Sequence, residues 1–253
     1  MSKIVSIHSY RGGTGKSNST ANLAVAVARK GYRVGIVDTD IQSPGIHILF
    51  DIDQEEIKHT LNDFLWGRCA IADAACDVTS VLADKATNRS RIYLVPSSVK
   101  INDISRILRE RFDVELLLGG FKDLIKNFDL DYLFIDTHPG LNQETLISLT
   151  TSDIVLFVLR PDQQDFQGTA VTVDVARRLR VPKLLLLINK ALVEYDFEDL
   201  QQQVEQNYQA PVAAIIPESH DMLRLASSGI FCLQFPDHPI SKALEKVAKL
   251  IVS

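Results

Sequence analysis

The chain has 253 residues, a formal net charge of −5 at pH 7 and a hydrophobic fraction of 46%. This length suits one large α/β domain and is short for two. The negative balance excludes a strong overall attraction to nucleic acid or anionic lipid, although a local basic patch is compatible with it. With no apolar run near the roughly 18 residues of a membrane span and no room for a signal peptide, we expect a cytoplasmic protein.

The first elements are a strand, a glycine-rich loop and a helix. The apolar run Lys3–His8 predicts a buried strand, and helical spacing continues to about residue 30 after the loop. Between them lies the segment Gly12-Gly13-Thr14-Gly15-Lys16-Ser17. This order is the context of a phosphate-binding loop, although Tyr10 stands where the general pattern has its first glycine. A glycine-rich turn with an incidental lysine is the alternative.

The loop residues suggest separate roles in binding a nucleotide. Glycines let backbone N–H groups approach a polyphosphate, and the helix N-terminus adds its dipole. We expect Lys16 to reach the β- and γ-phosphates and the Ser17 hydroxyl to ligate Mg²⁺. Further nucleotide contacts are expected from Gly12, Gly13, Thr14, Gly15 and Asn18.

A second buried strand, residues 34–38, ends in two carboxylates. Asp38 and Asp40 lie two residues apart, so on an extended chain both can face the phosphates. Ligands of open α/β sheets bind at such strand ends. One carboxylate can orient a metal-bound water and the other the attacking water. A helix cap or a solvated turn is the alternative for either residue alone.

Residues 46–85 read as a helical insertion packed near this site, with one helix predicted over residues 55–66 from its apolar spacing. A strand at 91–96 and helices at 101–111 and 114–127 follow. The two helices carry arginines and lysines, but acidic residues alternate with them. A solvated mixed-charge face is therefore favoured over a nucleic-acid contact.

The strand at 131–136 runs into Asp136 and then into the turn 137–140. An acidic residue at this place is expected to hold Mg²⁺-bound water. The turn can sense a γ-phosphate, because a bound phosphate would order it. His138 in this turn is a candidate base or ligand, with an ordinary loop histidine as the favoured reading.

The remaining chain alternates helices with apolar strands. We predict helices at 143–151, 167–180, 197–208, 219–227 and 240–252, and strands at 154–159, 183–189 and 212–216. Asn189 ends a strand, but Leu192 stands where a guanine site would have an acidic reader. Asn189 is therefore expected to pair with adenine.

Nearly continuous apolar strands separated by helices are typical of a mostly parallel, twisted sheet that is flanked by helices on both faces. No repeat, linker or low-complexity segment divides the chain. We therefore predict a single α/β domain over residues 1–253.

These motifs, together with Pro217-Glu218 near the end, resemble the MinD/ParA family of deviant Walker A P-loop ATPases in kind and in order. The resemblance implies a P-loop NTPase that binds ATP and Mg²⁺ and dimerises with two nucleotides between the subunits. It also implies slow hydrolysis, stimulated by a partner protein, and the positioning of cargo such as plasmids, chromosomes or division proteins. Carried over, Lys16 would bind phosphate and Asp40 would orient the attacking water. Ser17, Asp38 and Asp136 would support the metal, and Asn189 and Pro217 would line the adenine.

Arg11 departs from the family, whose signature lysine occupies this position and reaches into the partner's site. Arginine keeps the charge and can contact two phosphate oxygens at once. We expect Arg11 to replace the lysine and to act in catalysis, against the alternative of a solvated surface arginine.

The surface on which such a switch would act stays open. Non-specific DNA of the nucleoid is a candidate through Arg177, Arg178, Arg180 and Lys183, which could equally stabilise a helix end. Membrane binding is less expected, because the spacing of the last helix suits packing on the domain.

A metallocentre-assembly or cofactor enzyme on the same scaffold is the alternative function. It requires bridging cysteines, and Cys69, Cys76 and Cys232 show no metal-binding spacing. A tyrosine-kinase-like ATPase would want a tyrosine-rich tail. An adaptor that binds nucleotide without hydrolysing it is not favoured, because the lysine and the carboxylates expected to act in hydrolysis are all present.

Overall fold

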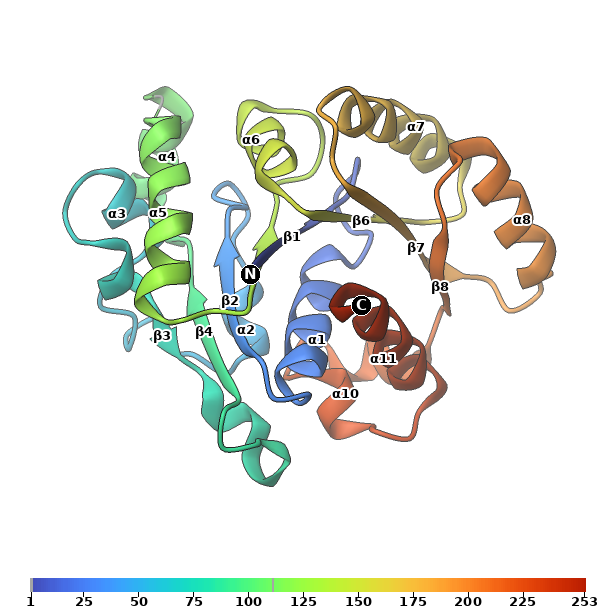
Figure 1. The fold of residues 1–253 in the computed structure, drawn as a ribbon, viewed down its shortest axis with the longest axis horizontal. Coiled ribbons are helices and arrows are strands. Elements are labelled where there is room, and N and C mark those ends of the chain that lie inside the picture. The colour runs from blue at the N-terminus through green and yellow to red at the C-terminus, as the bar shows by residue number, and fades with distance from the viewer. Residues whose placement is uncertain (1, 111) are drawn as a thin grey trace.

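The computed structural model describes residues 2–110 and 112–253, which form one eight-stranded sheet with helices on both faces (Figure 1). The elements in chain order are β1 Lys3–His8, α1 Lys16–Ala28, β2 Arg33–Asp38, α2 Ile46–Leu49, α3 Leu61–Leu65, the 3₁₀ helix η1 Ile71–Ala74, β3 Cys76–Asp77, the 3₁₀ helix η2 Thr79–Lys85, β4 Arg91–Val95, α4 Ile101–Arg109, α5 Val114–Asn127, β5 Tyr132–Asp136, α6 Gln143–Thr151, β6 Ile154–Leu159, α7 Gln163–Arg178, β7 Lys183–Ala191, α8 Phe197–Tyr208, β8 Val212–Pro217, α9 His220–Leu225, α10 Phe231–Gln234 and α11 Pro239–Val252.

The strand order is β3-β4-β2-β5-β1-β6-β7-β8, and neighbouring strands are parallel except in the β3–β4 pair. β5 therefore lies between β1 and β2, and its last residue, Asp136, pairs in register with Ile7 on one side and Asp38 on the other. This arrangement confirms the predicted fold class. It also brings the ends of three separate strands to one edge, where open α/β sheets bind ligands.

The sheet is buried on both faces, which explains why its strands are apolar throughout. In β6, Ile154, Leu156 and Val158 pack in the core that contains α1 and α11. The alternate residues, Val155, Phe157 and Leu159, pack in a second core against α7 and α8. Successive strand residues point to opposite faces, so a strand covered on both sides needs apolar residues at every position.

The helix that follows the glycine-rich loop, α1, is buried along almost its whole length. It packs on the sheet beside α11, which lies on the same face and places the side chains of Ile240, Leu244 and Val247 in the same core (Figure 1). The prediction that the last helix packs on the domain is confirmed. No helix in the described part of the chain is both long and apolar enough to cross a membrane.

The predicted helix over residues 55–66 is wrong for its first half, because α3 begins only at Leu61. The Thr60 side chain accepts the backbone N–H of Asp63, and the Asp63 carboxylate accepts that of Thr60, so this capping box sets the helix start. Asp162 similarly caps α7, which begins at Gln163, four residues before the predicted start. The predicted end of the helix at residue 111 lies outside the described residues.

Candidate functional site

The loop between β1 and α1 needs glycine for two reasons. Gly13 and Gly15 have φ angles of +78° and +94°, which favour glycine. In addition, a Cβ atom on Gly15 would lie only 2.3 Å from the Asn189 side-chain nitrogen. The loop therefore closes tightly on the end of β7, while Gly12 and Gly13 stay exposed to solvent.

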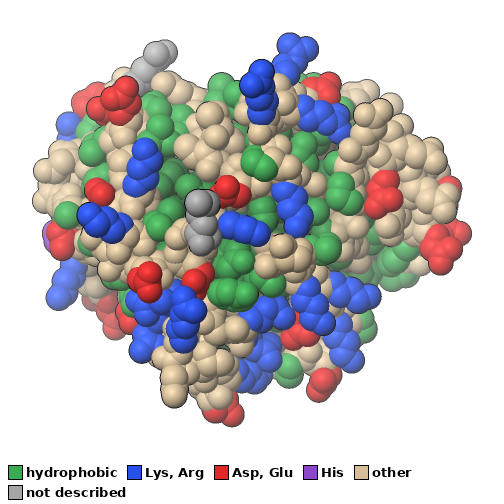
Figure 2. All heavy atoms as spheres, in the orientation of Figure 1, with side chains coloured by type: hydrophobic (Ala, Val, Ile, Leu, Met, Phe, Trp, Pro, Cys, Tyr) green, Lys and Arg blue, Asp and Glu red, His purple; other side chains and the backbone are tan. Residues whose placement is uncertain are grey.

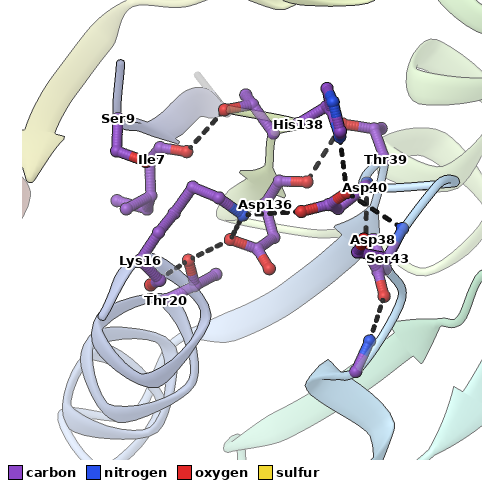
Figure 3. A network of polar contacts seen from close by, with 12 residues as sticks. Ile7, Ser9, Lys16, Thr20, Asp38, Thr39, Asp40, Ser43, Asp136 and His138 are labelled. Carbon is purple, nitrogen blue, oxygen red and sulfur yellow. Dashed lines mark hydrogen bonds and ion pairs between the residues drawn. The ribbon is translucent and has the colours of Figure 1, made fainter. Parts of the chain in front are cut away.

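Lys16, at the start of α1, points into the end of the sheet (Figure 3). Its Nζ lies 2.8 Å from Asp136 Oδ1 and 3.6 Å from Asp40 Oδ2, and its side chain is only 5% exposed. Burial alone would lower the pKa of Lys16, but the attraction of Asp136 and Asp40 outweighs it and raises this pKa above its ordinary value. The structure thus brings the predicted lysine and two predicted carboxylates into direct contact.

Asp136 contributes a buried acceptor atom at the centre of this group. Its Oδ1 lies 2.9 Å from the Thr20 hydroxyl as well as near Lys16, whereas its buried Oδ2 has no hydrogen-bond partner among the described residues. A buried carboxylate oxygen without a partner is costly unless a ligand or water satisfies it. Thr20 was not predicted, although it follows Lys16 by one helical turn.

Asp38 is tied to the turn that follows β2. Its Oδ1 accepts the backbone N–H of Asp40 at 3.0 Å, and its Oδ2 faces the N–H of Gly45 at 3.4 Å. Burial raises the pKa of Asp38 well above its ordinary value, and the nearby Asp136 adds to this effect. Asp38 therefore shapes the turn, while the carboxylate of Asp40 faces Lys16.

A cavity of about 330 Å³ opens beside the loop, between α1 and the ends of β7 and β8. Five predicted nucleotide-binding residues line it: Gly13, Gly15, Asn18, Asn189 and Pro217. Asn189 donates its amide to the Thr14 carbonyl oxygen at 2.7 Å. Sequence reasoning missed other lining residues, among them Asn22, Lys190, Met222 and Leu223. Met222 and Leu223 could have been identified from the sequence, because both lie in the short helix predicted directly after Pro217-Glu218.

Arg11 lies apart from this cavity and contacts the start of α7. Its Nη1 is 3.6 Å from Asp162 Oδ1, its Nε is 3.8 Å from Asp165 Oδ1, and its side chain is 40% exposed. Asp165 itself is buried and is also bound by Arg160. The guanidinium of Arg11 is thus held near the loop but away from Lys16.

Curated relatives cover nearly the whole chain. An uncharacterized ATP-binding protein of Methanocaldococcus jannaschii is 26% identical over 253 residues, which cover 100% of this chain and 88% of the relative. An iron–sulfur cluster carrier protein of Pyrococcus abyssi is 22% identical over 260 residues, with 98% of this chain and 85% of the relative covered.

Solved structures match over the same extent. The cell division ATPase MinD of Pyrococcus furiosus has a TM-score of 0.80 at 25% identity, with 99% of this chain and 98% of that chain covered. MinD of Pyrococcus horikoshii in complex with Mg-ADP has a TM-score of 0.79 at 24% identity, with 99% and 96% covered. The MinC:MinD complex of Aquifex aeolicus has a TM-score of 0.80 at 19% identity, with 99% and 96% covered; these last two show the fold alone.

A family model described as an AAA domain matches residues 2–182, more than half of the chain. The glycine-rich loop with Lys16, the carboxylates at the ends of β2 and β5, and the cavity beside Asn189 lie together at the carboxyl ends of the parallel strands, where open α/β sheets bind ligands. The chain belongs to the MinD/ParA family of P-loop ATPases.

Proposed function

We propose that this protein is an ATP-dependent dimerising switch that hydrolyses ATP with Mg²⁺ and positions a large intracellular cargo under the control of a partner protein. The observation that carries the proposal is the buried contact of Lys16 with Asp136 and Asp40 beside the phosphate loop. When a polyphosphate binds beside the loop, Lys16 can exchange these carboxylates for phosphate oxygens. The carboxylates are then left to orient metal-bound water and the attacking water.

The residues present fit a magnesium–phosphate group. Asp136 Oδ2 is a buried acceptor without a partner among the described residues, as an atom that receives a hydrogen bond from metal-bound water would be. Ser17 stands in the first turn of α1, where its hydroxyl can serve as a ligand. Magnesium would supply charge neutralisation of the phosphates, and Lys16 would add its own positive charge.

Adenine is the base that the cavity favours. Asn189 donates one hydrogen of its amide to the Thr14 carbonyl oxygen, and its own side-chain carbonyl oxygen can serve as an acceptor beside the cavity. An acceptor there suits the exocyclic amino group of adenine and repels the carbonyl oxygen of guanine. Leu192, where a guanine site would have an acid, supports the same preference.

Arg11 is the residue that we assign to the partner subunit's nucleotide. Its contacts with Asp162 and Asp165 are long ion pairs on a half-exposed side chain, so solvent screening leaves them weak. The guanidinium can therefore exchange them for phosphate oxygens of a second nucleotide in a dimer. In that role it would act as an arginine finger supplied in trans.

Solution mass measured with ADP and with Mg-ATP tests the proposal. Asp40→Ala blocks hydrolysis, and Arg11→Ala in the same background removes the trans contact. We expect Mg-ATP to produce a dimer that Arg11→Ala loses and Arg11→Lys keeps. A protein that binds Mg-ATP but stays monomeric would contradict the switch.

The positioning surface is a separate question, for which we put nucleoid DNA first. Figure 2 shows several groups of Lys and Arg side chains along the lower half of this face, with Asp and Glu among them, whereas α7 lies in the upper half of the same view (Figure 1). Arg177, Arg178 and Arg180, at and just beyond the end of α7, are all exposed, and Arg177 also contacts Asp174 and the Tyr208 carbonyl oxygen. Binding of the ATP-bound dimer to duplex DNA should weaken steeply with salt if these residues contact phosphates.

Metallocentre assembly is the second candidate, because one relative is named an iron–sulfur cluster carrier. Cys69 and Cys76 lie between β2 and β4 and are half-buried, and Cys232 is buried in α10. Iron measured in protein purified without oxygen separates the two functions: a stoichiometric amount per dimer would favour the carrier.

A further inference from the structure

His138 contacts the carboxylate to which we assign the attacking water. It lies in the turn after β5, two residues beyond Asp136, and its Nδ1 is 2.7 Å from Asp40 Oδ1 (Figure 3). Asp40 comes from the turn after β2, so the contact joins two segments 98 residues apart in the sequence. The Asp40 side chain is 9% exposed and that of His138 is 23% exposed.

The partners define the direction of this hydrogen bond. An ionised carboxylate only accepts, so Nδ1 of His138 carries the hydrogen and donates it to Asp40. The bond fixes the orientation of the imidazole ring and, equally, the orientation of the carboxylate. The Ser43 N–H adds a longer contact to the same oxygen, at 3.3 Å.

On its other side, Asp40 faces Lys16, with 3.6 Å between Oδ2 and Nζ. If ATP binds as proposed, Lys16 turns toward the phosphates and cannot hold Asp40 as well. Among the described residues, His138 is then the side chain that still orients the Asp40 carboxylate.

The turn that carries His138 is anchored to the phosphate loop. The Thr137 N–H bonds the Ile7 carbonyl oxygen at 3.3 Å, and the Gly140 N–H bonds that of Ser9 at 3.0 Å. Because Ile7 and Ser9 lead directly into the loop, a shift of this turn with the nucleotide would move His138 and, through the hydrogen bond, Asp40.

We propose that His138 is a positioning residue for ATP hydrolysis: its Nδ1–H holds the Asp40 carboxylate against the attacking water and couples it to the turn 137–140. This inference rests on the proposed function, in which the chain hydrolyses ATP with Asp40 at the water. It assigns His138 no contact with the nucleotide, so His138 should affect turnover and not affinity.

Three substitutions test it. The amide nitrogen of asparagine can take the place of Nδ1, whereas that of glutamine reaches the place of Nε2, so His138→Asn keeps the hydrogen bond and His138→Gln does not. We expect His138→Ala and His138→Gln to lower kcat by about 10- to 100-fold, as other residues that orient a reacting group do. His138→Asn should stay within about threefold of wild type, and KM and the Kd for ATP should change by less than about twofold in all three. His59→Ala, a histidine of the segment between β2 and β4, is the control and should hydrolyse ATP as wild type does.

The outcomes separate this inference from the proposed function. If wild type does not hydrolyse ATP, the proposed function fails and the inference fails with it. If wild type is active and His138→Ala keeps its kcat, or His138→Gln restores it as well as His138→Asn, the inference alone is overturned. A parallel loss of ATP affinity would also overturn it, because it would show that His138 supports the fold of the site. Should His138→Ala fail to fold, the comparison of the Asn and Gln variants still decides.

Discussion

The aromatic ring of Tyr10 lies directly on Gly168: a Cβ atom at position 168 would come within 1.8 Å of Tyr10 Cδ1. Tyr10 precedes the phosphate loop, and Gly168 lies in the second turn of α7. Tyr10, which stands where the general phosphate-loop pattern has a glycine, therefore packs in a specific place on α7. The packing of Tyr10 on Gly168 holds the entry of the loop against α7, and the weak ion pairs of Arg11 with Asp162 and Asp165 lie beside it.

Gly168→Ala should displace the Tyr10 ring and loosen the loop. A Cβ at this distance cannot be accommodated without moving the ring, so we expect weaker ATP binding, by about 3- to 10-fold in titration. Tyr10→Ala in the same chain should recover most of the loss, since it removes the clashing ring. Gly119→Ala in α5 is the control, because a Cβ there meets no atom within 4 Å and alanine favours the helix by up to about 1 kcal/mol. If Gly168→Ala and Gly119→Ala changed ATP binding equally, the packing of Tyr10 on Gly168 would not support the loop.

His8 should make the nucleotide-free protein sensitive to acid. Its Nδ1 bonds the Thr137 hydroxyl at 2.7 Å, and burial, with a smaller effect of Lys16, lowers the pKa of His8 to about 3. Between the unfolded value of 6.5 and about 3, the unfolded chain binds a proton that the folded chain does not. Stability is therefore full above about pH 6.5 and is lost as the pH falls toward 3, by on the order of 5 kcal/mol.

Urea unfolding at several pH values, with His8→Asn beside wild type, measures this loss. The variant should lose clearly less stability between pH 6.5 and pH 4 than wild type, because asparagine does not titrate. His59→Asn should leave the wild-type slope. If His8→Asn has the same slope as wild type, His8 is not the acid-sensitive group.

Lys16→Ala should both abolish ATP binding and destabilise the free protein. It leaves Asp136 and Asp40 buried without their cation, a situation that typically costs about 3 to 5 kcal/mol. Adding Asp136→Asn removes one of the uncompensated charges and should recover part of the stability without restoring ATP binding. Chemical unfolding and nucleotide titration of the single and double variants separate the two effects.

Asn189→Ala should weaken ATP binding more than GTP binding. The substitution removes the acceptor assigned to adenine, which is worth about 0.5 to 1.5 kcal/mol, or roughly 2- to 10-fold in affinity. It also removes the support of Thr14, and this part should affect both nucleotides equally. An unchanged ratio of ATP to GTP affinity would mean that Asn189 supports the loop and does not read the base.

The sequence predicts those parts of the fold and site that depend on neighbours in the chain. Helices α5, α6 and α8 and strand β6 have the predicted bounds, because apolar spacing and caps are local signals. Over residues 55–60 the prediction rested on Ile57 alone, and the capping box at Thr60 starts the helix after it. The two-residue strand β3 is too short to leave a pattern.

Contacts between residues that are far apart in the sequence could not be predicted from local patterns. Nothing near Asp40 or His138 in the sequence says that β5 pairs with β2, so their hydrogen bond could not be predicted. The same holds for Thr20 with Asp136, and for Tyr10 with Gly168. The sequence shows which polar residues follow each strand. Which of these residues contact one another depends on the order of the strands in the sheet.

The burial of α1 sets where the molecule can respond to its nucleotide. A helix packed against both the sheet and α11 cannot tilt without opening a core, so the backbone at its start is fixed and only the side chain of Lys16 can turn toward a nucleotide. The turns 39–45 and 137–140, which carry Asp40 and His138, lie outside this core and are the segments that can shift with the nucleotide. In amide hydrogen exchange, α1 should belong to the slowest set whether ADP or ATP is bound, and the protection of the two turns alone should distinguish the two states.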